Sequence, residues 1–390
     1  MLLEIAWLTL AAIHFGVPLT YYAYLKSYLD KPWNLKIDDG YAPTVSIVIP
    51  TYDEEAFIES RLDNILEQGY PSERLEIIVV DSASSDRTVE LARSWGREHP
   101  DAKLRILEEP ERRGKTSALN TALQHANGEV VVLADADSFW EKNALKEAVK
   151  YFAEPKVGAV TCLKMPIQRG EAKRQTLAVE STYRSFYNKV RVAESKIHST
   201  PIFHGELAAF RKRTLLKIGG FKQGIGADDS HAATLIALEN YRAIMAPEII
   251  AYELTPRSLK SYIAWKARRA IHLVQSFWLT VKEIRRAPIG FRRILLTEAF
   301  LHLVNPWLLL VASLLFIAFI MVSEFLLLKI VALLTLTFAL TIKRIRRVLT
   351  TWVIDQLVLI YACLKGLRSK EVPWTKIEEV RGPSACNLTC

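Results

Sequence analysis

The sequence predicts an α/β fold, with a Rossmann-like mixed sheet in a central domain and apolar helices on either side of it. Between about residues 42 and 255, short β-branched runs alternate with stretches of helical spacing, which is typical of strand–helix–strand units. Apolar stretches precede and follow that segment. Two acidic motifs, Leu133-Ala134-Asp135-Ala136-Asp137 and Gly226-Ala227-Asp228-Asp229, lie inside the predicted domain.

Three apolar stretches approach or exceed the roughly 20 residues that are needed to cross a bilayer core. Residues 5–25 and 299–323 contain no Asp, Glu, Lys or Arg, and residues 325–342 contain only Lys329. The first stretch lacks the basic start and the small-residue cleavage site of a signal peptide, so we favour a retained anchor at 1–28 over a cleaved leader. The other two predict a transmembrane hairpin at 299–342.

A fourth apolar stretch, residues 348–364, contains Asp355 and has positive charge on both sides. It either crosses the membrane or forms an interfacial or re-entrant helix, and we favour the second. The remaining segments are then amphipathic interfacial helices at 256–298 and a helix with a cytoplasmic tail at 343–390.

Basic residues beside the predicted spans indicate orientation. All of them fall on one side of the membrane if the globular domain is cytoplasmic, which predicts a multi-pass protein of the cell membrane. These residues are Lys26, Lys31, Lys36, Arg285, Arg286, Arg292, Arg293, Lys343, Arg344, Arg346 and Arg347.

The formal net charge of +9 does not indicate nucleic-acid binding. The excess positive charge clusters beside apolar spans with interleaved aromatic residues, notably over 257–293, which suits anionic lipid headgroups. The four cysteines match neither a disulfide framework nor a metal-ligand spacing, so a reducing compartment is the simplest interpretation.

The first elements of the domain follow in order. Residues 44–49 form a β-branched strand that we expect Pro50 to close, and residues 61–68 have helical spacing that ends before Gly69 and Pro71. Residues 75–80 form a second strand ending in Asp81, and residues 82–86 predict a turn with a helix cap at Asp86.

Two further strands complete this half of the sheet. Residues 104–107 form the third strand, and the spacing of apolar residues predicts a helix after Gly114. Residues 130–133 are a short β-branched run after the turn at Asn127-Gly128, and this fourth strand leads into Asp135 and Asp137. Such alternation implies a mainly parallel sheet, which binds ligands beyond the carboxyl ends of its strands.

Polar residues follow each of these four strands and should therefore share one crevice: Asp53 and Glu54, then Asp81, then Arg113 and Lys115, then Asp135 and Asp137. Two carboxylates two residues apart suit a hard divalent cation such as Mg²⁺ or Mn²⁺. Because such cations also bind substrate phosphates, a nucleoside-diphosphate ligand is predicted.

In these motifs the chain resembles the family 2 glycosyltransferases, which are inverting sugar-nucleotide enzymes with the GT-A fold. The resemblance covers about residues 44–270 and five motifs in the family's order. The matching residues are Val48-Ile49-Pro50-Thr51-Tyr52-Asp53-Glu54, Val79-Val80-Asp81-Ser82-Ala83-Ser84-Ser85-Asp86-Arg87-Thr88, Arg113-Gly114-Lys115-Thr116-Ser117-Ala118-Leu119-Asn120, Leu133-Ala134-Asp135-Ala136-Asp137-Ser138, and Gly219-Gly220-Phe221 with Asp228-Asp229.

The resemblance implies that Asp53 and Asp81 help hold the nucleoside of a UDP- or GDP-sugar. It also implies that Asp135 and Asp137 reach the diphosphate and its metal, and that Asp229 lies near the acceptor. Chemistry supports these roles, because a cation and Lys115 would stabilise the leaving diphosphate.

A neutral acceptor hydroxyl needs a base, and we assign that role to Asp229 with Asp228 beside it. Repulsion between adjacent carboxylates raises one pKa, which suits a base near neutral pH. The alternative is that the pair only caps the helix that follows.

The acceptor is the most open question. Processive synthases of this family carry Gln-x-x-Arg-Trp after the catalytic domain, and here the stretch is Trp265-Lys266-Ala267-Arg268-Arg269. Arg268 keeps its place and could contact the donor diphosphate, but the tryptophan that stacks under a growing polymer is replaced. We therefore expect transfer to a lipid or lipid-linked acceptor. A processive synthase, a polyprenyl-phosphate glycosyltransferase and an inactive scaffold are the alternatives.

Overall fold

The computed structural model describes residues 2–168 and 175–366. One mixed sheet forms the centre of the globular domain, with the strand order β3-β2-β1-β4-β7-β6-β8-β5. The strands are β1 Val45–Thr51, β2 Leu75–Asp81, β3 Leu104–Glu108, β4 Val130–Leu133, β5 Ser138–Trp140, β6 Val157–Ile167, β7 Ala208–Arg211 and β8 Arg242–Leu254. The α/β class with a mixed sheet that the sequence predicts is confirmed.

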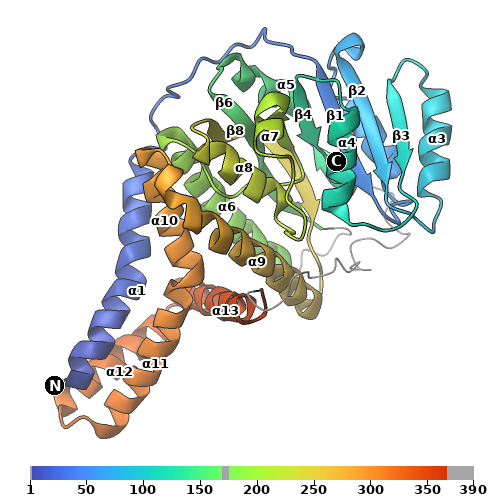
Figure 1. Cartoon of the computed structure of the whole chain (residues 1–390). Helices are drawn as coiled ribbons and strands as arrows, with labels where there is room; N and C mark the ends of the chain where they lie inside the picture. Colours follow the sequence, from blue (N-terminus) through green and yellow to red (C-terminus); the bar gives the residue numbers. More distant parts are fainter. Residues whose placement is uncertain (1, 169–174, 367–390) are drawn as a thin grey trace.

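Helices cover both faces of the sheet and continue into a separate projection (Figure 1). In the globular part and at its base they are α2 Ile58–Leu66, α3 Thr88–Glu98, α4 Lys115–His125, α5 Ala144–Val149, α6 Gln175–Ile197, α7 Lys212–Lys217, α8 Asp228–Leu238, α9 Leu259–Thr280 and α10 Ile289–Leu303. The projection contains α1 Leu2–Lys26, α11 Asn305–Val322 and α12 Leu326–Thr341, and α13 Lys343–Gly366 lies at its junction with the domain.

The core has two layers because successive side chains of a strand point to opposite faces. Ile47 and Ile49 of β1 pack with α2, α3 and α5 on one face, whereas Val48 packs with α4, α8 and α10 on the other. Strands that are buried on both faces must be apolar without alternation. This explains the continuous β-branched runs seen in the sequence.

Strands β3, β2, β1 and β4 are parallel, as the strand–helix alternation predicts. Strand β7 then runs antiparallel to β4, with Leu133 opposite Ala208. The end of β4 therefore lies beside the start of β7, and the loop before β7 meets Asp135. Strand β5 pairs with β8 so that Ser138 faces Glu253, which brings a third segment to the same edge.

Strand β1 continues through Pro50 to Thr51, whereas the sequence analysis expected it to end at residue 49. Ala134 N donates to Val48 O at 3.0 Å, so Val48 faces β4, and Pro50 faces the same side two residues later. Because β4 has ended at Leu133, the missing N–H of Pro50 costs the sheet no hydrogen bond.

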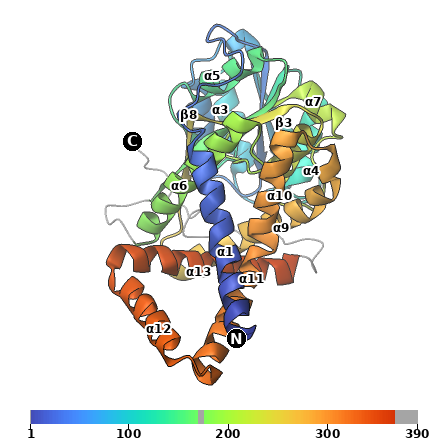
Figure 2. The same cartoon turned by 90° about the vertical axis from the view of Figure 1, so that its left-hand side faces the viewer.

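Among the described residues, three helices are long and apolar enough to cross a membrane: Leu2–Lys26, Asn305–Val322 and Ile345–Gly366. Helix α12 is apolar but has 16 residues, about 24 Å at 1.5 Å per residue, which is short of the bilayer core. The third candidate span, Ile345–Gly366, thus follows the apolar stretch at 325–342 that the sequence analysis expected to cross the membrane. Figure 2 shows α13 lying across the direction of α1 and α11 rather than along it.

We expect Gly128→Ala to destabilise the fold. A Cβ at Gly128 would lie 2.5 Å from Ser46 N and 2.7 Å from Val45 C, which are backbone atoms of the central strand. The expected loss is about 1–3 kcal/mol in the free energy of unfolding, measured by denaturation in detergent. Gly40→Ala is the matched control, because its Cβ would meet only a flexible carboxylate at 3.4 Å. Equal stability of the two variants would contradict this account of the turn.

Candidate active site

A cleft of ≈ 1080 Å³ begins at the carboxyl end of β4 and continues to the helices at the base of the domain. Its lining from the sheet side includes Thr51, Glu54, Lys115, Asp135, Asp137, Gly205, Glu206, Asp228 and Asp229. Its lining from the helical side includes Tyr22 of α1, Arg268 of α9, Leu301 of α10, and Trp352 and Gln356 of α13. One cavity thus joins the acidic motifs to the helices that continue into the apolar projection.

Four charged side chains from three segments meet in the cleft. Lys115 Nζ lies 2.7 Å from Asp135 Oδ1 and 3.8 Å from Asp228 Oδ2. A Cβ on Gly205 would lie 3.1 Å from Asp135 Oδ2, 3.2 Å from Lys115 Nζ and 3.4 Å from Asp229 Oδ2. A side chain at position 205 would therefore crowd these groups, and we name Lys115, Asp135, Asp228 and Asp229 around Gly205 the charged cluster.

The pKa values in the charged cluster are shifted by its crowding. Desolvation opposes the charge of Lys115, but Asp135, Asp228 and Asp229 outweigh it and raise the pKa of the ammonium. Burial and the adjacent Asp228 raise the pKa of Asp229 from 3.8 to about 7, although Lys115 acts in the opposite direction. Burial also raises the pKa of Asp228. Asp229 is therefore poised to exchange a proton near neutral pH.

Asp228 and Asp229 occupy the first turn of α8, but they do not cap it in the usual way. The N-cap is Ala227, without a side-chain hydrogen bond, and Asp229 Oδ1 accepts from the neighbouring Ser230 N at 2.6 Å. Capping therefore does not account for the pair, and the carboxylates face the cleft.

Asp135 and Asp137 both line the cleft just after β4 and are half-buried. Within residues 2–168 and 175–366, no three His, Cys, Asp or Glu side chains converge as a metal site. A carboxylate pair suits Mg²⁺ or Mn²⁺ in a site that substrate phosphates and water complete. Arg61 lies buried behind the pair, stacked 4.2 Å from the Trp140 ring, and burial lowers its pKa to about 9 against the pull of Asp135 and Asp137.

Asp53 and Asp81 lie at the neighbouring strand ends but do not line this cleft. The Asp81 carboxylate is 2% exposed and accepts from Thr51 Oγ1 at 3.0 Å and Ser84 N at 2.8 Å. Asp53 has a left-handed φ of 54° and accepts from Ser85 N at 2.8 Å. Both carboxylates therefore hold the loop after β2 against the loop after β1, and their contact with a nucleoside stays a prediction.

On the helical side, Arg268 and Arg269 both line the cleft, and Arg269, whose side chain is 32% exposed, is held by ion pairs with Glu253 and Glu206. Arg269 pairs with Glu253 and lies over the Trp265 ring at 3.9 Å, and Lys164 pairs with both Glu253 and Glu206. Sequence reasoning missed Lys164, Gly205, Glu206 and Glu253. The polar stretch His204-Gly205-Glu206 was the signal that could have indicated a site there. It does not follow a predicted strand, so the search for polar residues at strand ends passed over it.

The chain's similarity to known proteins agrees with this geometry. Residues 46–219 match the model of glycosyl transferase family 2. The solved structure of the mannosyltransferase PcManGT from Pyrobaculum calidifontis, in complex with GDP-Man and Mn²⁺, is 46% identical and superimposes with a TM-score of 0.80. The match covers 95% of this chain and 100% of that one. The chain belongs to family 2 of the glycosyltransferases.

Two curated relatives are more distant. Poly-beta-1,6-N-acetyl-D-glucosamine synthase of Staphylococcus epidermidis is 25% identical over 70% of this chain and 66% of its own length. The Methanococcus voltae enzyme named dolichyl N-acetyl-alpha-D-glucosaminyl phosphate 3-beta-D-2,3-diacetamido-2,3-dideoxy-beta-D-glucuronosyltransferase is 24% identical over 56% of this chain and 69% of its own length. The chain spans 54% to 69% of the length of such curated relatives.

The raised pKa of Asp229 predicts a pH-dependent gain in stability for Asp229→Asn. An acid whose pKa rises on folding, here from 3.8 to about 7, destabilises the fold as pH increases through that interval. At pH 8 the free energy of unfolding of the variant should therefore be about 2 kcal/mol higher than that of the wild type. At pH 4 the variant should show no such gain. Thermal unfolding at both pH values measures the difference. The exposed Asp101→Asn is the control, and a gain of equal size at pH 4 would contradict the prediction.

Proposed function

We propose that the protein transfers a sugar, with inversion, from a nucleoside-diphosphate sugar to a lipid or lipid-linked acceptor at the cytoplasmic face of a membrane. The observation that carries this proposal is the single cleft that joins the charged cluster to α9, α10 and α13. A soluble donor can reach the cluster from the sheet side, and an amphipathic acceptor can reach it from the helical side.

The donor is a GDP- or UDP-sugar, and GDP-mannose is the first to test because the relative that is 46% identical was solved with it. Asp135 and Asp137 would hold Mg²⁺ or Mn²⁺, which would neutralise the diphosphate during departure. Lys115 sits next to Asp135 and adds a second positive charge on the leaving group. Asp53, Asp81 and Arg268 are the remaining residues that we assign to donor binding.

The acceptor hydroxyl is a weak nucleophile until a base takes its proton. Asp229 is our candidate base, because its pKa of about 7 lets it accept a proton at neutral pH. Asp228, which is 3% exposed and paired with Lys115, positions the ammonium. As the hydroxyl oxygen bonds to the anomeric carbon, the bond to the diphosphate breaks and the configuration at that carbon inverts.

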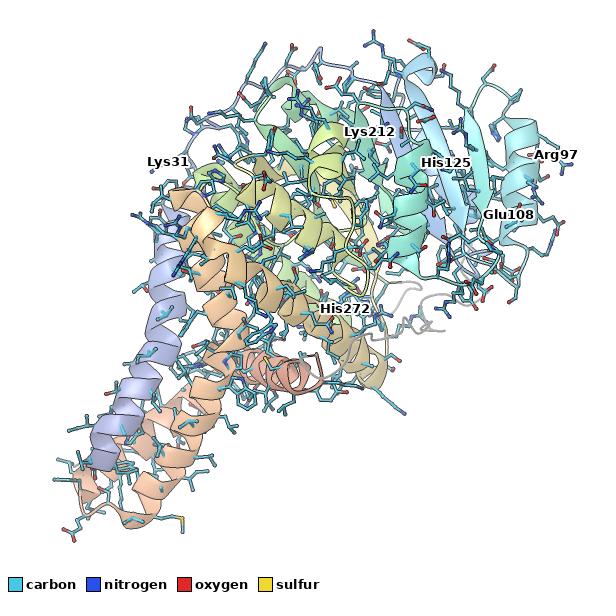
Figure 3. The ribbon with its side chains drawn as sticks, viewed as in Figure 1. Lys31, Arg97, Glu108, His125, Lys212 and His272 are labelled. Carbon is cyan, nitrogen blue, oxygen red and sulfur yellow. The ribbon has the colours of Figure 1, made fainter. Side chains whose placement is uncertain are left out.

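Helices α1 and α11 are long and apolar enough to span a bilayer, and as membrane anchors they would keep the cleft near its surface. Side chains of α11 and α12 such as Leu314, Met321 and Leu327 are exposed apolar groups, which suits a lipid surrounding. Lys31, labelled in Figure 3, lies beside the globular domain at the inner end of α1, as a cytoplasmic domain requires. The transverse course of α13 supports an interfacial helix, whose tail lies outside the described residues.

A processive synthase is the alternative, favoured by the 25% identity to a poly-beta-1,6-N-acetyl-D-glucosamine synthase. The arginine at position 269, which is paired with Glu253, cannot stack beneath an acceptor sugar as an exposed tryptophan does. The product formed from radiolabelled GDP-mannose or UDP-sugars and membrane lipids separates the two functions. We expect a single labelled product, soluble in organic solvent, and a ladder of long products would exclude single transfer.

Asp137→Asn should lower Mn²⁺-dependent hydrolysis of the donor by about a hundredfold. The variant should also lose the increase in GDP affinity that Mn²⁺ gives the wild type, because one of two carboxylate ligands is gone. Calorimetric titration of GDP with Mn²⁺ or with chelator measures this without turnover. Asp101→Asn is the exposed control, and unchanged metal dependence in Asp137→Asn would contradict the proposed ligand.

The pH dependence of transfer should follow the titration of Asp229. The rate should rise through about pH 7 as the carboxylate loses its proton, and then level off. Asp229→Asn should lose transfer by about 10²–10⁴-fold while still binding GDP with Mn²⁺. Initial rates from pH 5.5 to 8.5 measure the profile. A pH-independent rate in the wild type would remove Asp229 as the base.

A further inference from the structure

Several buried oxygen atoms of the described residues line the cleft without a hydrogen-bond partner, and three of them belong to residues between the charged cluster and the helices. They are Asn188 Oδ1 of α6, Gln356 Oε1 of α13, and Glu206 Oε2 of the loop before β7. The three residues are 5%, 4% and 2% exposed. A buried polar atom without a partner costs about 1–3 kcal/mol, so their presence around one cavity indicates a ligand that supplies partners.

These residues connect the charged cluster to the helical end of the cleft. Asn188 Nδ2 donates to Lys164 O at 3.1 Å, which fixes the amide, and Lys164 Nζ pairs with Glu206. Gln356 follows Asp355, which pairs with Lys266 of α9 at 2.7 Å. Lys266 in turn lies 4.1 Å from the centre of the Tyr183 ring on α6. Helices α6, α9 and α13 thus enclose this part of the cleft, which we name the helical arm.

These three oxygen atoms are hydrogen-bond acceptors, so a ligand that satisfies them must donate. An ionised phosphate has only acceptor oxygens, whereas sugar hydroxyls are donors. Apart from Arg268, which we assign to the donor, the arm has among its described residues five cations that are compensated by carboxylates: Lys164 by Glu206 and Glu253, Arg184 by Glu180, Arg191 by Glu194 and Glu298, Lys266 by Asp355, and Arg269 by Glu253. A phosphate would have to break such pairs, and a saccharide would not.

We propose that the helical arm is a saccharide subsite, in which Asn188, Gln356 and Glu206 accept hydrogen bonds from the sugar of a lipid-linked acceptor. The proposal rests on the function proposed above and narrows it. The acceptor is a glycosylated lipid with a free hydroxyl rather than a lipid phosphate. Because Gln356 belongs to α13, the subsite is complete only when that helix is docked against α6 and α9.

Two acceptors with the same chain, dodecyl mannoside and dodecyl phosphate, test the proposal with purified full-length protein. Hydrolysis of GDP-mannose and UDP-sugars without any acceptor is measured in parallel. We expect transfer to the mannoside and not to the phosphate. Asn188→Leu and Gln356→Met should each lower the ratio of mannoside transfer to donor hydrolysis by about tenfold, the equivalent of one neutral hydrogen bond. The loss should appear mainly in the KM for the mannoside.

Matched variants separate a binding role from a folding role. Gln356→Glu keeps an acceptor oxygen and should retain most of the transfer, and Gln124→Leu on the exposed face of α4 should behave as the wild type. Transfer to dodecyl phosphate alone, transfer to neither lipid, or an unchanged ratio in both variants would overturn the saccharide subsite. If no donor is hydrolysed and no membrane lipid is labelled in the product assay described above, the proposed function itself fails.

Discussion

The ion pair between Lys115 and Asp135, extended to Asp228, is the interaction on which the candidate site depends. It holds together carboxylates from two distant parts of the chain, one after β4 and one at the start of α8. Without the ammonium, these carboxylates and Asp229 would repel one another within a few ångströms, in a cleft where water screens them poorly. Gly205 leaves room for the arrangement, because a Cβ there would lie only 3.1–3.4 Å from Asp135 Oδ2, Lys115 Nζ and Asp229 Oδ2.

The same constraint explains the shifted acidity of the cluster. Lys115 can compensate Asp135 and Asp228 in part, and Asp229 is left with a pKa near 7 because burial and its neighbour outweigh the cation. A bound donor would add the negative charge of its diphosphate and the positive charge of its cation to the charges that set the pKa of Asp229. Under the proposed function, binding of the donor and deprotonation of Asp229 are linked through Lys115.

The second constraint is the joining of the sheet domain to the helices. Lys164, Glu253, Arg269 and Glu206 form a buried network between β6, β8 and α9, and Lys266 with Asp355 extends it to α13. Buried charges are stable only when each is compensated, so α9 and α13 have a defined position against the domain. The same helices, with α6, therefore form one wall of the cleft. The unpartnered oxygens of Asn188 and Gln356 in this wall are the atoms that we propose to bind the acceptor.

Much of the fold and part of the candidate site could be predicted from the sequence. Strand–helix periodicity determined the parallel half of the sheet, and the two acidic motifs determined the carboxylates at its edge, because local spacing and strand ends are local properties. The antiparallel strand β7, which carries Gly205 and Glu206 to Asp135, depends on pairing between residues 75 positions apart in sequence (Leu133 with Ala208) and has no local signal. Likewise, Asp53 and Asp81 were placed at the correct edge, but only folding decided that their carboxylates join the loop after β1 to the loop after β2. Tertiary structure alone decided that α13 lies against α9 and lends Gln356 to the cleft, since the packing of a helix on a distant surface follows from the shape and charge of both partners.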